Sequence, residues 1–173
     1  MKRIITFLFF AITLTNCAQE KTQFDKVALD EVFKNVKGQE IQFKDILKKH
    51  QGKTIFIDIW ASWCSDCVGG IPKLKKLQKS KTDVVYVLLS LDKDTKSWKD
   101  GIKKHQLKAD HYLFTNKWKQ SPFCKSIKLD WIPRYMIVGK DGSVKMYKAI
   151  DFKDNKILKT IKADDDGVEV DGF

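Results

Sequence analysis

The sequence has few cysteines, few helix-breaking residues and no long apolar segment. Four cysteines, three prolines and nine glycines occur among its 173 residues, without repeats or low-complexity tracts. A composition that is 43% hydrophobic and 12% aromatic is typical of a globular protein and excludes a mostly disordered chain. The length fits one domain with a full hydrophobic core and is too short for two ordinary domains.

No apolar run reaches the roughly 20 residues that a membrane-spanning helix needs. The chain opens with MKRIITFLFFAITLTNCAQ, in which Lys2 and Arg3 precede largely apolar residues from Ile4 to Leu14. A short apolar run behind two cations is typical of a secretory signal. We therefore predict that the protein is exported and that residues 1–16 are a signal peptide.

The sequence LTNC at residues 14–17 resembles a bacterial lipoprotein signal, in which cleavage before a cysteine frees that cysteine for acylation. The resemblance implies that Cys17 is lipidated and anchors the protein to a membrane of the cell envelope or periplasm. Asn16 departs from the pattern, because such signals usually carry glycine, alanine or serine there. The alternative is that Cys17 belongs to a discarded peptide. Residues 17–26 are polar and fit a tether.

The chain is basic, with a formal net charge of +11. Its lysines are scattered among acids, and no dense stripe of arginine and aromatic residues indicates a nucleic-acid interface. An exported protein would also not meet nucleic acid. The charge therefore favours solubility and attraction to an anionic membrane surface or acidic partners.

Apolar periodicity predicts an α/β domain over residues 27–163, followed by an acidic tail at 164–173. Nearly continuous apolar runs at 54–60 and 84–91 are typical of strands that are covered on both faces. Other strands are expected in a hairpin within 27–43 and at 111–114, 133–138 and 143–148, with helices at 43–50, 65–80, 95–107, 117–128 and 154–162. This alternation, closed by a hairpin, predicts a sandwich with a mixed sheet.

The sequence WASWCSDC places Cys64 and Cys67 directly behind the apolar run at 54–60. A purely structural disulfide here would close a tiny loop and restrict the unfolded chain little. A zinc site lacks a second closely spaced pair of ligands. If a helix begins at Cys64, the helix dipole favours its thiolate, which could attack a substrate disulfide while Cys67 resolves the mixed disulfide. We predict dithiol–disulfide exchange.

These residues resemble the thioredoxin superfamily. The shared features are WASWCSDCVGGIP, with Pro72 five residues after the second cysteine, and the downstream WIPRYMIV. With the leader and the N-terminal hairpin, the resemblance is strongest to membrane-anchored oxidoreductases of the TlpA/ResA kind. It covers roughly residues 27–163 and implies a thioredoxin-like three-layer sandwich, with a central mixed sheet and an N-terminal β-hairpin extension.

The resemblance also implies roles for residues around the cysteines. Pro133 should follow a cis peptide bond and face the pair. Ile132 and Pro133 should form the wall where a substrate strand lies, with the backbone of Ile132 free to pair with it. Trp63 and Trp131 would add apolar surface there, although either could belong to the core. Asp58 aligns with a buried aspartate that accepts a proton from the resolving cysteine, and burial would raise its pKa. The alternative is that Asp58 points to solvent.

The chain departs from the family at two places. Relatives of the ResA kind carry a glutamate where this chain has Gly70, which leaves Asp58 as the candidate proton carrier. Ser65 and Asp66 replace the Gly-Pro of thioredoxins between the cysteines. Asp66 would disfavour the Cys64 thiolate and so give a reducing tendency, or it could simply be an acid in the first helical turn. Cys124 is expected to be a small buried helix residue.

The prediction is therefore a protein-disulfide reductase that acts on exported proteins, such as apocytochrome c, with the Cys64–Cys67 disulfide in place of a cofactor or metal. The resemblance implies a membrane thiol electron donor as a second partner. A disulfide oxidase or isomerase would use the same residues at a higher potential. A thiol peroxidase lacks its supporting threonine and arginine. A redox-inactive, surface-anchored binding module or a copper-handling protein remains an alternative, although no histidine is placed by motif.

Overall fold

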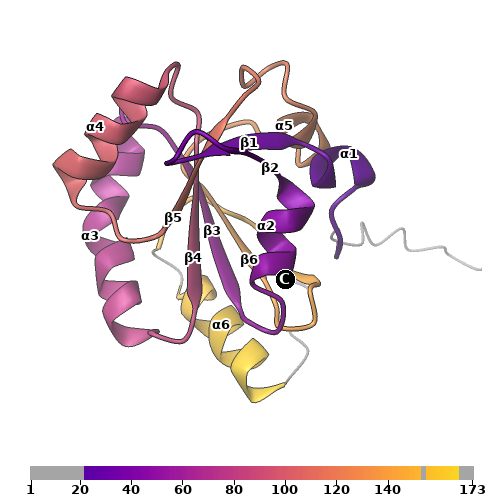
Figure 1. The fold of residues 1–173 in the computed structure, drawn as a ribbon. Coiled ribbons are helices and arrows are strands. Elements are labelled where there is room, and N and C mark those ends of the chain that lie inside the picture. Colours follow the sequence, from indigo (N-terminus) through magenta and orange to yellow (C-terminus); the bar gives the residue numbers. More distant parts are fainter. Residues whose placement is uncertain (1–21, 153–154, 168–173) are drawn as a thin grey trace, which may run out of the picture.

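The computed structural model describes residues 22–152 and 155–167. Figure 1 shows the described elements arranged around one central sheet. The strands are β1 Val32–Asn35, β2 Glu40–Gln42, β3 Ile55–Trp60, β4 Val85–Ser90, β5 Asp110–Phe114, β6 Arg134–Val138 and β7 Val144–Ala149. The helices are α1 Lys26–Leu29, α2 Phe43–Lys49, α3 Ser65–Ser80, α4 Thr95–His105, α5 Pro122–Ser126 and α6 Lys156–Asp166.

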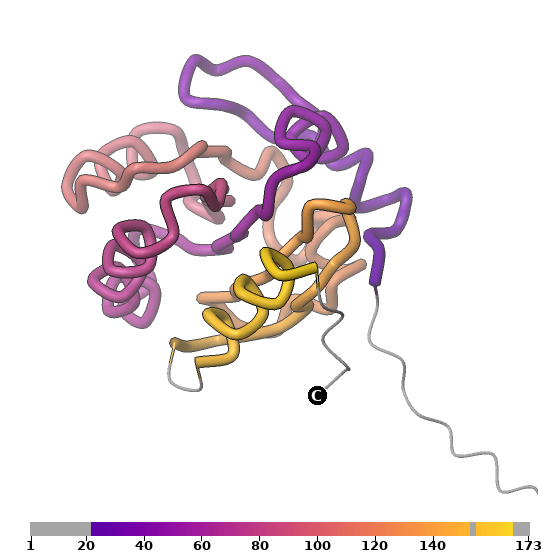
Figure 2. The backbone as a smooth tube through the Cα atoms, turned by 90° about the horizontal axis from the view of Figure 1, so that it is seen from below, coloured from indigo at the N-terminus to yellow at the C-terminus, as the bar shows by residue number. Residues whose placement is uncertain are grey.

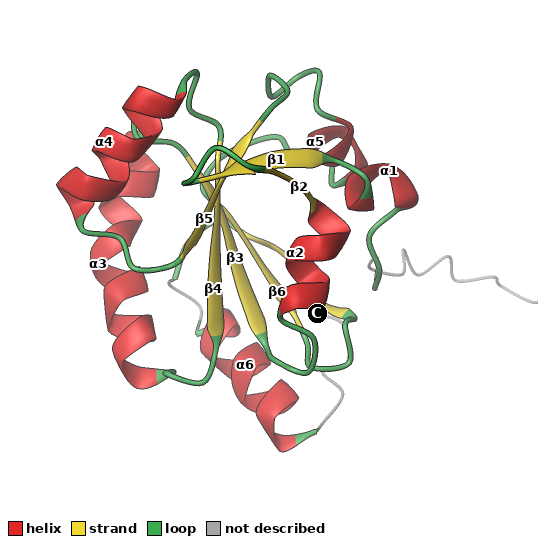
Figure 3. Cartoon of the chain, in the orientation of Figure 1, coloured by secondary structure: helices red, strands yellow, loops and turns green. Residues whose placement is uncertain are grey.

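The sheet is mixed, as predicted, with strand order β2-β1-β5-β4-β3-β6-β7. β3 pairs in parallel with β4, and β4 with β5, whereas the remaining neighbours are antiparallel. The connections through α3 and α4 step across the sheet in the same direction. Since such crossovers are right-handed, both helices cover the same face, and they lie side by side in Figures 2 and 3.

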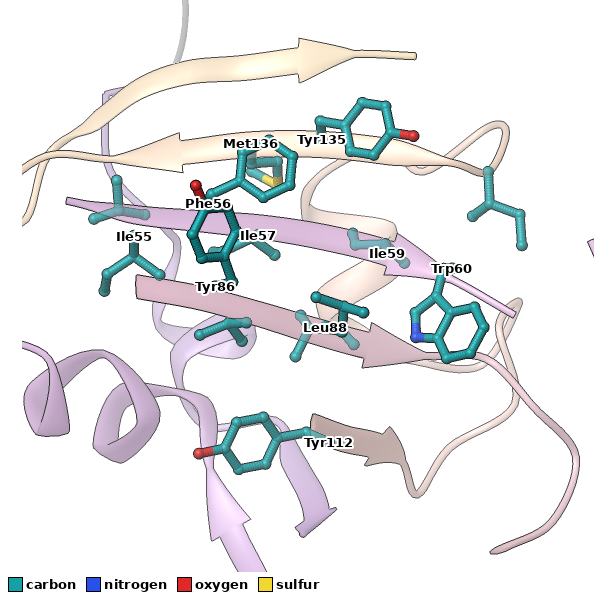
Figure 4. Packing of buried hydrophobic residues seen from close by; sticks show 14 of the residues in the cluster. Ile55, Phe56, Ile57, Ile59, Trp60, Tyr86, Leu88, Tyr112, Tyr135 and Met136 are labelled. Carbon is teal, nitrogen blue, oxygen red and sulfur yellow. The ribbon is translucent and has the colours of Figure 1, made fainter. Parts of the chain in front are cut away.

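β3 lies in the interior of the sheet, between β4 and β6, and all six of its residues are buried. Its side chains alternate between the two faces, so that Phe56, Asp58 and Trp60 share one face and the intervening isoleucines share the other. Figure 4 shows Phe56 and Trp60 among the buried side chains contributed by neighbouring strands. The strand therefore delivers the chain to the N-terminus of α3, where the cysteine pair lies.

The face opposite α3 carries a cluster of phenylalanines. Phe24, Phe33, Phe43, Phe114 and Phe123 have ring centroids separated by 4.6 to 6.0 Å. These rings come from the N-terminal segment, the first hairpin, α2, β5 and α5, and together they form the core of this layer. Layers of helix on both faces of the sheet confirm the predicted α/β sandwich.

The N-terminal boundary differs from the prediction. Phe24 is buried within this cluster, and α1 begins at Lys26, so the last residues assigned to the tether belong to the folded domain. The expected hairpin within 27–43 is correspondingly shorter, with β1 and β2 spanning 32–42. The reason is the Phe24 ring, which packs against Phe43 of α2 and Phe123 of α5, and alternation along the sequence does not reveal these contacts.

Two helices also differ from their expected bounds. The helix predicted at 117–128 is limited to α5, which starts where Ser121 caps it and Pro122 occupies the first turn. α6 continues to Asp166, and Asp164 is buried and accepts a hydrogen bond from the Thr54 hydroxyl at 2.5 Å. The first acids of the expected tail are therefore part of the last helix. The proposed leader, Cys17 and the final residues lie outside the described ranges.

Across the described residues, no helix is both long enough and apolar enough to span a membrane.

Candidate functional site

The two cysteines of WCSDC meet at the first turn of α3. Cys64 is the N-cap of this 16-residue helix and is bonded to Cys67 in a disulfide, with a Cα–Cα distance of 5.3 Å. The backbone N–H of Cys67 donates a hydrogen bond to the Cys64 sulfur at 3.1 Å. This donor and the positive end of the helix dipole favour negative charge on Cys64 once the disulfide is reduced.

The loop that precedes β6 lies against the same sulfur. The Ile132–Pro133 peptide bond is cis, as the resemblance implies, and the Cys64 sulfur lies 3.6 Å from the Ile132 carbonyl oxygen. Ile132 is 4% exposed, and the pairing of its backbone with a substrate strand stays a prediction. Trp63 and Trp131 are 58% and 59% exposed, which excludes the alternative that they belong to the core. They flank the cysteine pair as an exposed apolar surface.

Asp58 lies in β3, on the face that α3 covers. Its residue exposure is 7%, and its Oδ1 atom has no hydrogen-bond partner among the described residues. This burial raises the pKa of Asp58 to about 8. The alternative that Asp58 points to solvent is therefore wrong. An acid with a pKa near neutrality is suited to exchange a proton at physiological pH, and its role in catalysis stays a prediction.

Sequence reasoning missed Asp92, which holds the turn before Cys64. The buried Asp92 carboxylate accepts hydrogen bonds from the Ser62 hydroxyl at 2.7 Å and from the Ser90 hydroxyl at 2.8 Å. The backbone N–H of Ser62 donates to the same carboxylate at 3.2 Å. The signal in the sequence was an acid directly after a buried strand. Asp92 thus lies in a loop at the carboxyl end of a parallel strand, where functional sites of α/β proteins usually form.

A groove of about 390 Å³ opens beside the cysteine pair. It is lined by the first turns of α3, by Trp131 and Pro133, by Tyr135 of β6 and by the segment that follows β7. Gly70 lies at this groove, where a Cβ atom would come within 2.6 Å of the Tyr135 hydroxyl. The glycine at this position is thus explained by the side chain that approaches it.

Cys124 lies away from the exchange pair, in α5. It is a free thiol and is 3% exposed, and burial raises its pKa to about 12. This confirms the expectation of a small buried helix residue. Within residues 22–152 and 155–167, no group of three or more histidine, cysteine or acidic side chains could hold a metal ion.

Comparisons with known proteins agree with this geometry. A family model described as thioredoxin-like matches residues 52–144. The thiol-disulfide oxidoreductase ResA of Bacillus cereus is 25% identical over 128 residues, which cover 73% of this chain and 69% of the relative. The resemblance to the thioredoxin superfamily that WASWCSDCVGGIP indicated is therefore confirmed.

Solved structures show the same fold. The thioredoxin domain of a thiol-disulfide oxidoreductase from Bacteroides vulgatus has a TM-score of 0.64 at 21% identity, covering 80% of this chain and 97% of that one. A thiol-disulfide oxidoreductase from Bacteroides fragilis has a TM-score of 0.60 at 23% identity, covering 76% and 93%. These likenesses confirm the predicted thioredoxin-like architecture.

Proposed function

Because the chain belongs to the thioredoxin-like family, we propose that it is a thiol-disulfide oxidoreductase that reduces disulfides of exported proteins. The observation that carries the proposal is the Cys64–Cys67 disulfide at the N-terminus of α3, beside the cis Pro133. A helix N-terminus stabilises a thiolate, and exposed Trp63 and Trp131 offer apolar contact to a substrate segment beside it. The similarity to ResA, itself named as a thiol-disulfide oxidoreductase, supports the same activity.

In the proposed reaction, the dithiol form of the protein gives two electrons to the substrate. The Cys64 thiolate attacks one sulfur of the substrate disulfide, and the first substrate thiolate leaves and takes a proton from water. Cys67 then loses its proton to the Asp58 carboxylate and attacks Cys64. The bond between Cys64 and the substrate breaks, the second substrate thiolate leaves and takes a proton from water, and the Cys64–Cys67 disulfide is formed. A membrane thiol donor is proposed to restore the dithiol.

The reducing direction is supported by the residues between the cysteines. Asp66 is exposed and lies two residues from Cys64. A carboxylate there disfavours the Cys64 thiolate and so favours the disulfide over the dithiol, which is the property of a reductant. Export and anchoring through Cys17, in the periplasm or cell envelope, are proposed from the leader sequence.

The direction is tested by the reduction potential of the Cys64–Cys67 pair, measured in defined glutathione buffers. A potential near about −270 mV, as in thioredoxin, agrees with a reductase. A potential near about −120 mV would identify an oxidase instead and would reverse the proposed direction.

The activity itself is tested by trapping in cells. Cys67→Ser should accumulate mixed disulfides between Cys64 and exported proteins, because the resolving thiol is missing. Cys64→Ser is the matched control and should trap none. If neither variant traps a partner, the chain is a redox-inactive binding module and the proposal is overturned.

A further inference from the structure

Tyr135 shares a sheet face with the buried Asp58. The two residues are directly paired across β3 and β6, and paired residues of neighbouring strands project to the same side of a sheet. That side is the one covered by α3, the helix that begins at the cysteine pair. The Tyr135 ring packs there against Phe56 and Phe152, with centroid distances of 5.5 and 4.7 Å.

The Tyr135 hydroxyl reaches α3 at a position that is shaped for it. A Cβ atom at Gly70 would come within 2.6 Å of the hydroxyl oxygen, whereas a Cβ atom at the adjacent Gly69 would meet nothing within 4 Å. Two neighbouring glycines in one helix therefore differ, and only Gly70 is required by the packing of a side chain. The hydroxyl is held against the helix that carries Cys67.

Tyr135 lies between the buried interior and the groove: it is 2% exposed and lines the groove wall. Tyr135 is among the described residues that line the groove beside the cysteines, and Asp58 is not. Asp58 is buried, with its Oδ1 atom unpartnered among the described residues. A proton that Asp58 takes from Cys67 must afterwards leave this buried position. Tyr135 pairs with Asp58 on the same sheet face, borders the groove and carries a polar group.

We propose that Tyr135 supports the resolving step by acting through Asp58. Its hydroxyl passes protons between the Asp58 carboxyl group and water in the groove. This inference rests on the proposed function. When Cys67 gives its proton to Asp58, the Cys67 sulfur attacks Cys64, and Asp58 later returns to the carboxylate by passing its proton through the Tyr135 hydroxyl to water. The hydroxyl gives up one proton as it accepts another, so it is unchanged at the end.

Several charged groups face Tyr135 and bear on the pH dependence of this step. They are Asp58 of β3, Asp66 and Lys73 of α3, and Asp151 after β7. Burial, followed by the carboxylates of Asp58 and Asp151, raises the pKa of Tyr135. The hydroxyl therefore stays protonated across the pH range of the reaction and keeps a proton that it can donate.

The test is a double-mutant cycle on the resolving step. Single-turnover thiol release from a peptide disulfide is followed in the wild-type protein, Tyr135→Phe, Asp58→Asn and the double variant, between pH 5 and 9. Tyr135→Phe keeps the ring contacts and removes only the hydroxyl. We expect it to slow resolution roughly 3- to 10-fold, against about 100-fold for Asp58→Asn, and to move the apparent pKa of the profile upward. In the Asp58→Asn background it should have no further effect.

Two controls separate this role from a structural one. In a Cys67→Ser background, Tyr135→Phe should leave the rate of the first attack by Cys64 unchanged. Gly70→Ala, which displaces the hydroxyl, should slow resolution as Tyr135→Phe does, whereas Gly69→Ala should not.

The outcomes also separate this inference from the proposed function. Absence of disulfide reduction by the wild-type protein overturns both. An active wild-type protein with a slow Asp58→Asn variant and an unchanged Tyr135→Phe variant overturns the role of Tyr135 alone. An equal effect of Tyr135→Phe in the Asp58→Asn background, or equal slowing by Gly69→Ala and Gly70→Ala, also overturns it.

Discussion

The starts of α3 and α5 have the same local design and different chemistry. At α3 the N-cap is Cys64, whose sulfur accepts the backbone N–H of Cys67 at 3.1 Å. At α5 the N-cap is Ser121, whose hydroxyl accepts the backbone N–H of Cys124, also at 3.1 Å. Each helix therefore begins with a polar cap followed three residues later by a buried cysteine. The two starts differ in the cap atom and in the acid that is buried nearby.

The buried acid near α5, Glu31, has hydrogen-bond partners for both carboxylate oxygens among the described residues, whereas Asp58, on the face covered by α3, does not. The buried Glu31 accepts hydrogen bonds from the Asn116 amide at 2.9 Å, the Ser121 hydroxyl at 3.1 Å and the Phe123 backbone N–H at 3.0 Å. Asp58 has an Oδ1 atom without a partner among the described residues, and burial raises its pKa to about 8. A satisfied carboxylate stabilises a fold, whereas an unsatisfied one is available to exchange a proton.

The largest expected difference between the two sites is in activity. Cys64→Ser should lower disulfide reduction by about a thousandfold or more, because the nucleophile is lost. Cys124→Ala should leave activity within about twofold, since a buried thiol whose pKa is raised to about 12 forms almost no thiolate near neutrality. Turnover of a peptide disulfide measures both. A large loss in Cys124→Ala, with its fold intact, would contradict the assignment of one reactive site.

The second difference is in how stability depends on pH. Asp58 has a folded pKa of about 8, against about 3.9 for an unfolded aspartate. Between these pH values the folded protein holds a proton on Asp58 that the unfolded chain has released. The contribution of Asp58 to the free energy of unfolding is therefore fully present below pH 4 and is lost as the pH rises to 8. The slope approaches about 1.4 kcal/mol per pH unit.

Asp58→Asn should flatten this dependence and make the oxidised protein more stable than wild type at pH 8. Urea unfolding of both disulfide-bonded proteins between pH 4 and 8 checks the result. Other titrating groups cancel in the difference between the two proteins. Parallel curves for the two proteins would show that Asp58 is charged in the folded state.

The smallest expected difference is in capping. Ser121→Ala removes a cap and one donor to Glu31, and should cost about 1–2 kcal/mol of stability. Cys64→Ala in the reduced protein should cost less than about 1 kcal/mol, because sulfur is a weak acceptor. Chemical denaturation in excess dithiol measures both. Equal losses of stability would show that sulfur stabilises the helix N-terminus as well as oxygen does. The cysteine at α3 would then be explained by capping without its reactivity.

Prediction from sequence succeeded where a signal is local. The apolar run at 54–60 became β3, a fully buried interior strand next to the middle strand β4, and the helix expected at 65–80 is α3 with the same bounds. Prediction from sequence failed where the burial of a residue depends on segments that are distant in the sequence. Phe24 is buried among aromatic rings of other elements, and Asp164 is buried and accepts a hydrogen bond from the Thr54 hydroxyl. The predicted domain therefore started too late and ended too early.

The pair of cysteines behind a buried strand could be read from residue order alone, because that signal needs only spacing and local periodicity. The folded arrangement was needed to see that Asp58 is buried with no partner at Oδ1 among the described residues and that Glu31 is fully hydrogen-bonded. It also decided that Tyr135 occupies the space left by Gly70. The physical reason is that desolvation, hydrogen bonding and close packing depend on which distant segments meet, and meetings of distant segments leave no periodic trace along the chain.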